Sequence, residues 1–412
     1  MESGPARAAV LVFVLLILSA PVCIAGEKIR ILIIGAMTNL QLTKRFFDME
    51  PGVLYMTVPA RDPGGFFLSE ADLVKMIRLY FPRSYEELKN YDMIMLTSPD
   101  FFLITPKQDQ WMYDSIREGA GGYNDGSVFS IVSGVADSWS ISLTQQAFPN
   151  DAPAVTARGA GESPRNVASV DINDQAKYRI LSDFIPLGVE DVPGGGRLVL
   201  HREGSEVLAY QVGNFGPIKV DFVVAWEYQE GRTLTNGGWY GNGFWAYPTD
   251  PLKNQYSPDM LMNMVFWLTK RSLIEDVAVF HRLKGIFAEY TSRMAVLVSL
   301  LDFIDKFGAD TGKIQEDIMG LEDTYDMAVE HYLDQEFVEA EKDVLESLEL
   351  FSRAEEVARR EKNIALMWVY VIEWLVTVST FFIAGFVLWS LMVRRRLYRE
   401  VAKTSLSALK KE

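Results

Sequence analysis

The stretch Ile29–Ala36, IRILIIGA, decides the fold class of this chain. It is an apolar run rich in β-branched residues that is broken only by Arg30 and ends beside Gly35. Near-continuous apolar runs of this length are typical of parallel strands that are buried on both faces of a sheet. The sequence therefore predicts that residues 29–36 form the first strand of a parallel sheet.

Strand-like and helix-like segments alternate after this run, as they do in sheets that carry helices on both faces. Ser69 has the side chain of an N-cap and begins one amphipathic helix, while Pro106 opens another that is ended by glycines. The strands and helices expected in this part of the chain are 53–58, Glu70–Tyr80, Met93–Thr97, 106–118 and 128–132.

The pattern changes from Arg197 onward, because strand-like runs now follow one another through short turns. Residues 147–167 contain several prolines and glycines without a clear period, so we expect a long loop before this region. The elements expected after the loop are strands 197–201, 207–212 and 218–226, a short strand after Gly231, and a closing helix Ser257–Leu268.

Several segments together resemble the class I glutamine amidotransferase-like superfamily. They are SPDFFLITPKQDQWMYDSIREGAGG at 98–122, VFSIVSG at 128–134, EYQEGRTL at 227–234 and MLMNMVFWL at 260–268. Their order and spacing carry the resemblance, which covers residues 28–271 and is nearest to amidotransferase-like domains on prokaryotic membrane proteins. It implies an α/β fold, a flavodoxin-like sandwich of the amidotransferase type, over residues 27–271. The segments at 365–374 and 388–401 also resemble the anchors of archaeal surface proteins.

From residue 272 onward the composition changes to helix-forming residues with many carboxylates. We expect helices at 272–307, 314–333 and 334–362. Apolar residues recur at steps of three and four in the last of them, which indicates a buried stripe. These residues are Val344, Leu348, Phe351, Ala354 and Ala358. The sequence thus predicts an all-α stalk or bundle over 272–363, with a solvated acidic surface.

Residues 374–393, WLVTVSTFFIAGFVLWSLMV, contain no charged residue. A helix needs about 20 apolar residues to cross a bilayer, so one transmembrane helix with its outer flank is expected over 364–393. Aromatic rings suit the headgroup layer, and a carboxylate beside them remains within reach of water. The expected membrane-interface residues are Trp368, Glu373, Trp374, Arg394, Arg395 and Arg396.

Residues 1–25 have the pattern of a signal peptide, with a basic residue, a short apolar run and small residues before the cleavage site. Cleavage would remove Cys23, the only cysteine, and leave neither a disulfide nor a thiolate. The arginines after residue 393 favour a cytoplasmic tail over 394–412. We therefore expect a single-pass protein of the cell membrane, held in the lipid bilayer, with its N-terminal domain outside the cell.

The sequence offers little support for catalysis. The resemblance implies a nucleophilic cysteine on the turn after a central strand, assisted by a histidine and a carboxylate. The equivalent turn here is Ser133-Gly134, and the three histidines, His201, His281 and His331, fall in a strand and in the helical region. No histidine or cysteine pair has metal-ligand spacing and no glycine-rich turn precedes a helix as a phosphate cradle does, so no metal and no cofactor is expected. The net charge of −15 argues against a nucleic-acid partner.

Ligands of open α/β sheets bind outside the carboxyl ends of the strands. Polar residues follow several predicted strands, and an aromatic, glycine-rich loop over 237–247 is placed to close over them. The alternative is that its rings pack on the sheet or on the stalk. The candidate ligand cleft consists of Thr38, Asn39, Ser98, Asp100, Ser133, Gly134, Asp137, Trp239 and Trp245.

These observations favour a non-catalytic, membrane-anchored extracytoplasmic module for binding or assembly, whose partner is a small ligand or another envelope protein. Two alternatives remain open. One is a hydrolase or transferase with a non-cysteine site around Ser133 and Asp137. The other is an accessory subunit of an envelope transporter or secretion complex, in which the membrane helix makes the contact through Ser379 and Gly385.

Overall fold

The structure, a computed structural model, describes residues 27–125 except 64 and 66, and residues 167–189, 201, 204–213, 219–238, 243–245, 254–305 and 312–409. The chain forms two compact units. The first consists of Met1–Glu289 with Asp326–Val344, and the second of Tyr290–Tyr325 with Leu345–Glu412.

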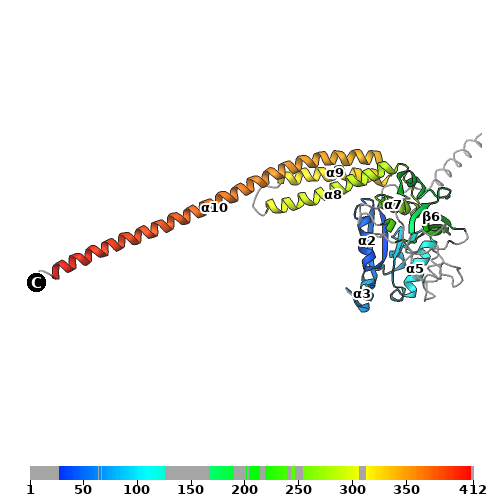
Figure 1. The fold of residues 1–412 in the computed structure, drawn as a ribbon, viewed down its shortest axis with the longest axis horizontal. Helices are drawn as coiled ribbons and strands as arrows, with labels where there is room; N and C mark the ends of the chain where they lie inside the picture. Colours follow the sequence, from blue (N-terminus) through cyan, green and yellow to red (C-terminus); the bar gives the residue numbers. More distant parts are fainter. Residues whose placement is uncertain are drawn as a thin grey trace, which may run out of the picture. The chain divides into compact units, whose positions relative to one another are not determined.

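The first unit is a mixed α/β domain (Figure 1). It is built on an eight-stranded sheet with the order β2-β1-β3-β4-β8-β7-β6-β5. The five neighbouring strands β2, β1, β3, β4 and β8 are parallel to one another. The next strand, β7, is antiparallel to β8, β6 is antiparallel to β7, and β5 is antiparallel to β6. The strands are β1 Ile29–Ala36, β2 Val53–Arg61, β3 Met93–Thr97, β4 Gly121–Asn124, β5 Val167–Ile172, β6 Glu206–Gly213, β7 Lys219–Tyr228 and β8 Gly231–Asn236.

The strand β1 forms where the sequence predicts it and lies between β2 and β3. Its residues 31–34 are completely buried, as expected of a strand covered on both faces. Gly35 lies so near to β3 that a Cβ atom there would be 1.9 Å from Oγ1 of Thr97. Close backbone approach therefore explains the glycine at the end of this strand.

Helices α3 and α5 cover one face of the sheet, since Ile77 of α3 and Met112 of α5 belong to the same buried cluster as Leu32 of β1. Ser69 caps α3 as predicted, and α5 begins with a capping box formed by Thr105 and Gln108. Among the described residues, the helices of the sheet domain are α2 Met37–Phe47, α3 Glu70–Tyr80, α4 Tyr85–Leu88, α5 Pro106–Arg117 and α7 Ser257–Leu268, with 3₁₀ turns at Phe101–Leu103, Ser182–Leu187 and Gly243–Trp245.

Helix α2 and strand β4 are present although the sequence did not predict them. Gly121 and Gly122, which we expected only to end the preceding helix, form half of β4 in the middle of the sheet. The strand expected at 128–132 and most of the loop expected at 147–167 lie outside the described residues, and β5 begins at Val167.

The long helices are α8 Val277–Asp305, α9 Gly312–Leu333 and α10 Phe337–Leu409. Their segments in the second unit pack through the predicted stripe on α10, in which Phe351, Ala354 and Ala358 are buried. Tyr290 of α8 stacks on Tyr325 of α9 with ring centroids 4.2 Å apart.

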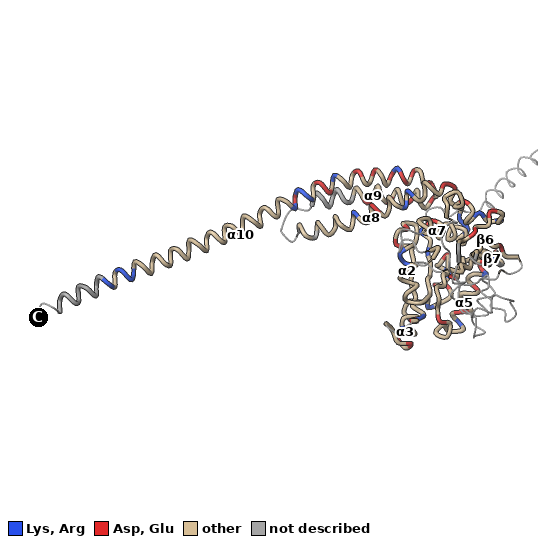
Figure 2. Tube along the Cα trace, in the orientation of Figure 1, with Lys and Arg blue, Asp and Glu red and all other residues tan. Residues whose placement is uncertain are grey.

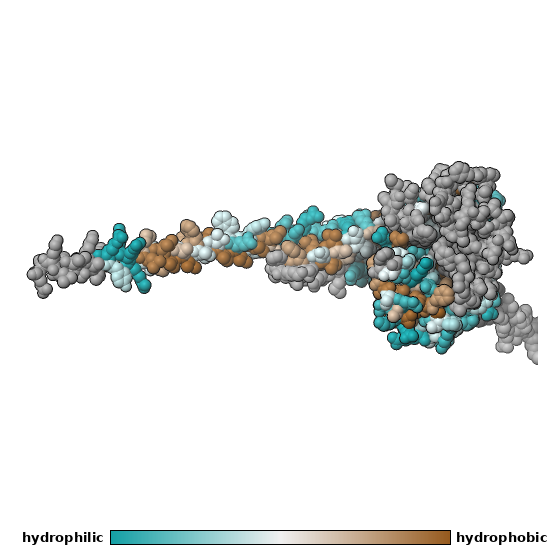
Figure 3. All heavy atoms as spheres, turned by 60° about the horizontal axis from the view of Figure 1, so that its bottom comes forward, coloured by the Kyte–Doolittle hydropathy of each residue, from teal (hydrophilic) through white to brown (hydrophobic). Residues whose placement is uncertain are grey.

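Helix α10 continues without a break from the stripe through the predicted transmembrane segment. It is the one helix, among those described, that is long and apolar enough to cross a membrane, and its apolar part is not buried by protein. Figure 3 shows this part of the helix as mostly hydrophobic, and Figure 2 shows an uncharged stretch that ends at basic residues near the C-terminal end; in the sequence, residues 374–393 carry no charge and Arg394 follows them.

Candidate functional site

The carboxyl ends of the parallel strands form the edge of the sheet at which ligands of such folds bind. The chain passes from β1 to β2 on one side and then to β3 on the other side, so the order of strands reverses next to β1. Four side chains define what we call the edge site. They are Asn39, Arg61, Ser98 and Asp125.

Asn39 lies in the first turn of α2, directly after β1, and its Nδ2 donates a hydrogen bond to Oδ2 of Asp125 at 3.3 Å. Asp125 follows β4, is only 1% exposed, and donates its backbone N–H to the carbonyl of Leu96 in β3. Thr38 is exposed and donates its hydroxyl to Oδ1 of Asn39. The structure thus brings the ends of β1 and β4 together through an amide and a carboxylate.

Ser98 follows β3 and has a φ of 60°, in the left-handed region that residues with a Cβ atom rarely adopt. Such a conformation costs about 1–3 kcal/mol and is found most often at functional positions. The hydroxyl of Ser98 accepts a hydrogen bond from Nη1 of Arg61, the last residue of β2, at 3.0 Å. A strained serine and a half-buried guanidinium therefore lie side by side at this edge.

Asp100 has a local structural role. Its carboxylate accepts the backbone N–H of Phe102 and caps the 3₁₀ turn Phe101–Leu103, while its own N–H donates to the carbonyl of Ala60. Arg61 and Asp125 were not among the residues predicted for the site. Arg61 ends a predicted strand that proved longer than expected, and Asp125 follows β4, which was not predicted.

Trp245 is completely buried and donates its indole N–H to Oδ1 of Asn236 at 3.1 Å, at the end of β8. Asn236 also donates to the hydroxyl of Tyr123 in β4. A Cβ atom on Gly238 would lie 2.7 Å from the indole of Trp245, which shows how closely the ring packs. Ligand contact by Trp245 stays a prediction, while Trp239, Ser133, Gly134 and Asp137 lie outside the described residues.

A second polar cluster lies within the first unit, away from solvent. We call it the charge clasp, and it consists of Glu50, Asp259, His281, Lys284 and Tyr332. The Lys284 ammonium contacts Glu50 and lies 3.3 Å from Oδ1 of Asp259. The Tyr332 hydroxyl donates to Glu50 at 2.6 Å, and His281 Nδ1 is 2.6 Å from Oδ2 of Asp259. Only the His281 side chain is substantially exposed.

Burial and charge act together in the clasp. Burial raises the pKa of Glu50, and Lys284 and Tyr332 offset part of that rise. Burial alone would lower the pKa of Lys284, but the carboxylates of Glu50 and Asp259 outweigh it, so the net shift is upward. Burial and the neighbouring Glu50 raise the pKa of Tyr332 well above its usual value. Lys284 is thus held as a cation between two acids.

Each of the three histidines has an aspartate as its nearest polar partner. His201 pairs with Asp221 and His331 with Asp343, each at 2.7 Å, in the same way as His281 pairs with Asp259. Among the described residues, no group of three or more histidine, cysteine, aspartate or glutamate side chains is arranged to hold a metal ion.

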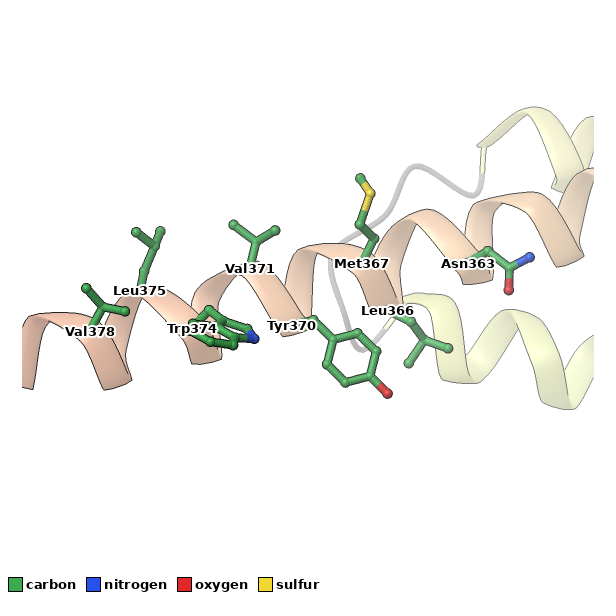
Figure 4. A pocket seen from close by; sticks show the side chains of 8 residues that line it. All are labelled: Asn363, Leu366, Met367, Tyr370, Val371, Trp374, Leu375 and Val378. Atoms are coloured by element: carbon green, nitrogen blue, oxygen red, sulfur yellow. The ribbon is translucent and has the colours of Figure 1, made fainter.

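A concave surface of another kind runs along α10 at the start of its apolar part (Figure 4). Every side chain lining it comes from this single helix, and all but one are apolar or aromatic. They are Asn363, Leu366, Met367, Tyr370, Val371, Trp374, Leu375 and Val378. Such a surface suits lipid chains and headgroups better than a dissolved ligand.

No known family model matches this chain, and no curated protein matches it in sequence. Solved structures that resemble it include two cytoplasmic proteins, from Salmonella typhimurium and from its strain LT2. Each is 16% identical in sequence to this chain. The match to the first has a TM-score of 0.36 and covers 58% of this chain, and the match to the second has a TM-score of 0.35 and covers 59%; both cover 98% of the matched protein. A third solved structure, of a protein from Bacteroides uniformis described as ThuA-like, is 14% identical to this chain with a TM-score of 0.37. The match covers 61% of this chain and 94% of that protein. Likenesses this weak carry no argument about function.

Proposed function

We propose that this chain is a non-catalytic binding module that a single membrane helix holds at the outer surface of the cell. In this proposal the sheet domain is a flavodoxin-like sandwich of the amidotransferase type, and its ligand binds at the edge site. The observation that carries the proposal is the gathering of Asn39, Arg61, Ser98 and Asp125 at the carboxyl edge, beside the reversal in strand order.

The chemistry of the edge site indicates the class of ligand. An amide, a guanidinium, a hydroxyl and a carboxylate supply both hydrogen-bond donors and acceptors and both signs of charge. A small polar molecule with hydroxyl groups, or with an ammonium and a carboxylate, matches this set. Free sugars and amino acids are therefore the first compounds to test.

The site can be tested with the full chain purified in detergent. Its thermal unfolding is measured with each of the common amino acids and monosaccharides in turn. A ligand that binds only the folded state stabilises it by about 2.7 kcal/mol when its concentration is 100 times its Kd. We expect at least one compound to raise the unfolding temperature, and we expect Arg61→Ala to abolish the rise.

Arg83→Ala is the matched control, because Arg83 is an exposed arginine of the same domain outside the edge site. It should leave the ligand effect intact. The proposal fails if no compound stabilises the wild-type protein, or if Arg61→Ala and Arg83→Ala behave alike.

The membrane tether follows from α10. An apolar helical segment, aromatic residues before it and arginines after it form the usual sequence of a spanning helix whose C-terminal end is cytoplasmic. Together with a cleaved signal peptide, this arrangement exports the sheet domain. Protease added to intact cells should digest residues 27–363 and spare a tag at Glu412, whereas digestion of the tag alone would show the reverse orientation.

An accessory role in an envelope complex is a second candidate function, because the outer strand of the sheet exposes apolar side chains. The edge strand β2 exposes Leu54 and Met56, and Leu79 and Tyr80 at the end of α3 line the same groove. Exposed apolar patches at a free strand edge are typical of protein contacts. Leu54→Glu should dissociate such a complex during gentle detergent purification, and a Lys75→Glu control should not. Equal recovery of partners in both variants would exclude this role for the patch.

A further inference from the structure

One helix joins the edge site to the charge clasp. Helix α2 carries Asn39 in its first turn, and it ends at Phe47, three residues before Glu50. The backbone N–H of Glu50 donates to the carbonyl of Phe47 at 3.0 Å, so the turn that holds Glu50 is continuous with the helix. An α-helix rises about 1.5 Å per residue, which makes α2 a rigid element of about 16 Å with one functional side chain near each end.

The clasp holds the turn after α2 at two points. Glu50 contacts Lys284 of α8 and accepts a hydrogen bond from Tyr332 of α9. Two residues later, a Cβ atom on Gly52 would lie 2.9 Å from Cε1 of Tyr332, so the ring of Tyr332 also packs on the backbone of the turn. A displacement of α2 along its axis would therefore disturb an ion pair, a hydrogen bond and a packing contact together.

We propose that α2 couples the two sites, so that ligand occupancy at Asn39 regulates how firmly Lys284 and Tyr332 hold Glu50. This inference rests on the proposed function and adds regulation to the same site. The coupling is reciprocal. If the ligand changes the equilibrium constant for closing the clasp by some factor, then closing the clasp changes the ligand's affinity by the same factor. The helices that receive the change are α8 and α9, and α10 begins four residues after α9 ends.

Because its charges are buried, the strength of the clasp depends steeply on the position of α2. Coulomb energy inside a protein changes steeply with distance, and a buried ion pair is favourable only in good geometry. Apolar side chains of similar volume would hold the helices as well and would tolerate small shifts. The use of a glutamate, a lysine and an aspartate at a dry contact thus converts a small movement of α2 into a large change in the strength of the contact.

A double-mutant cycle tests the coupling without any ligand. Asn39→Ala and Tyr332→Phe are made singly and together in the full chain, and denaturant unfolding of the first unit is followed by hydrogen exchange of β1 and β3. Tyr332→Phe removes only the hydroxyl that bonds Glu50 and keeps the ring. We expect the double variant to differ at least three-fold in folding equilibrium constant from the product of the single effects. A second cycle with Lys284→Met should deviate in the same direction.

The control cycle combines Asn39→Ala with Arg179→Ala, which removes an exposed guanidinium that pairs with Asp183. Distant, independent sites combine within about two-fold, so this cycle should be multiplicative. If the Asn39–Tyr332 cycle is equally multiplicative, the coupling is wrong.

A ligand arm separates failure of the coupling from failure of the proposed function. The probe is the amino acid or monosaccharide that most stabilises the wild-type protein, and its Kd is measured by calorimetry. Tyr332→Phe should change that Kd at least three-fold, and Arg179→Ala should not. If no compound binds, the proposed function fails and the mutant cycle alone decides the coupling. If a compound binds with the same Kd in both variants, the edge site stands and the coupling is overturned.

Discussion

Glu50 and Lys284 form an ion pair in which both side chains are almost completely removed from solvent. Glu50 comes from the turn after α2 and Lys284 from the second turn of α8, so the pair joins the sheet to a helix more than half the chain away in sequence. Asp259 of α7 is the second carboxylate beside Lys284. The pair therefore connects three elements of the first unit through one ammonium group.

Lys284→Met should destabilise the first unit strongly. Removing one partner of a buried ion pair leaves uncompensated charge and typically costs 3–5 kcal/mol, here on Glu50 and Asp259, so we expect about 4 kcal/mol in denaturant unfolding. Adding Glu50→Gln to this variant should restore part of the loss. Arg282→Ala is the control on the same helix: the Arg282 side chain pairs with Glu341 but is itself largely exposed, so its loss should destabilise the first unit far less than the loss of Lys284. Similar losses in the two single variants would contradict the buried pair.

The clasp should weaken in alkali. The folded-state pKa values of Lys284 and Tyr332 both lie above their ordinary values. Their contribution to stability is therefore complete below the unfolded pKa values, about 10.4 for lysine and 10 for tyrosine, and is lost as the pH rises through the folded values. The difference in unfolding free energy between wild type and Lys284→Met should therefore stay constant up to about pH 10 and shrink as the pH rises above about 10.4, the unfolded value of lysine. A difference that grows over this range would reverse the assigned sign.

The Ser98→Gly variant should be more stable than the Ser98→Ala variant. At a φ of 60° a Cβ atom costs about 1–2 kcal/mol, which glycine avoids. Both substitutions remove the hydroxyl that accepts from Arg61, so their comparison isolates the backbone effect. We expect Ser98→Gly to be more stable than Ser98→Ala by about 1 kcal/mol in thermal or denaturant unfolding. Greater stability of the alanine variant would mean that the backbone of Ser98 is unstrained.

Two glycines should respond to alanine in opposite ways. Gly35→Ala places a Cβ atom 1.9 Å from Oγ1 and 2.2 Å from the carbonyl oxygen of Thr97, so strand β1 must move, at a cost of about 3 kcal/mol. Gly285 lies in α8 with no atom within 4 Å of the added Cβ, so Gly285→Ala should stabilise by about 1 kcal/mol through helix propensity. Circular dichroism melts of both variants check this contrast, which would be refuted by equal effects.

The sequence predicted those elements whose signals are local. Ile29–Ala36 is apolar except for Arg30, Ser69 caps a periodic helix, and α7 is largely apolar with all of its residues buried. Helix α2 escaped prediction because Ala36 provides no side-chain cap. Strand β4 escaped because it has only four residues and two are glycines. A Cβ atom on Gly121 would lie 2.9 Å from Leu268, so close packing by α7, far along the chain, explains that glycine.

Part of the candidate site was predictable for the same reason. Thr38, Asn39, Ser98 and Asp100 follow strands that the sequence shows clearly, and the structure places them at the carboxyl edge. Their partners Arg61 and Asp125 depend on strand ends that the sequence does not mark. The charge clasp was not predictable, because Glu50, Asp259 and Lys284 look like ordinary surface charges until the fold buries them together.

The affinity of one small polar compound for two variants tests the central claim most directly. The amino acid or monosaccharide that gives the largest thermal stabilisation is titrated into the full chain and into Arg61→Ala by calorimetry. Loss of a charge-assisted hydrogen bond costs about 1.5–3 kcal/mol, so the Kd for Arg61→Ala should be at least ten-fold weaker than for wild type. An unchanged Kd in Arg61→Ala would place the ligand elsewhere and contradict a binding site at the carboxyl edge of the sheet.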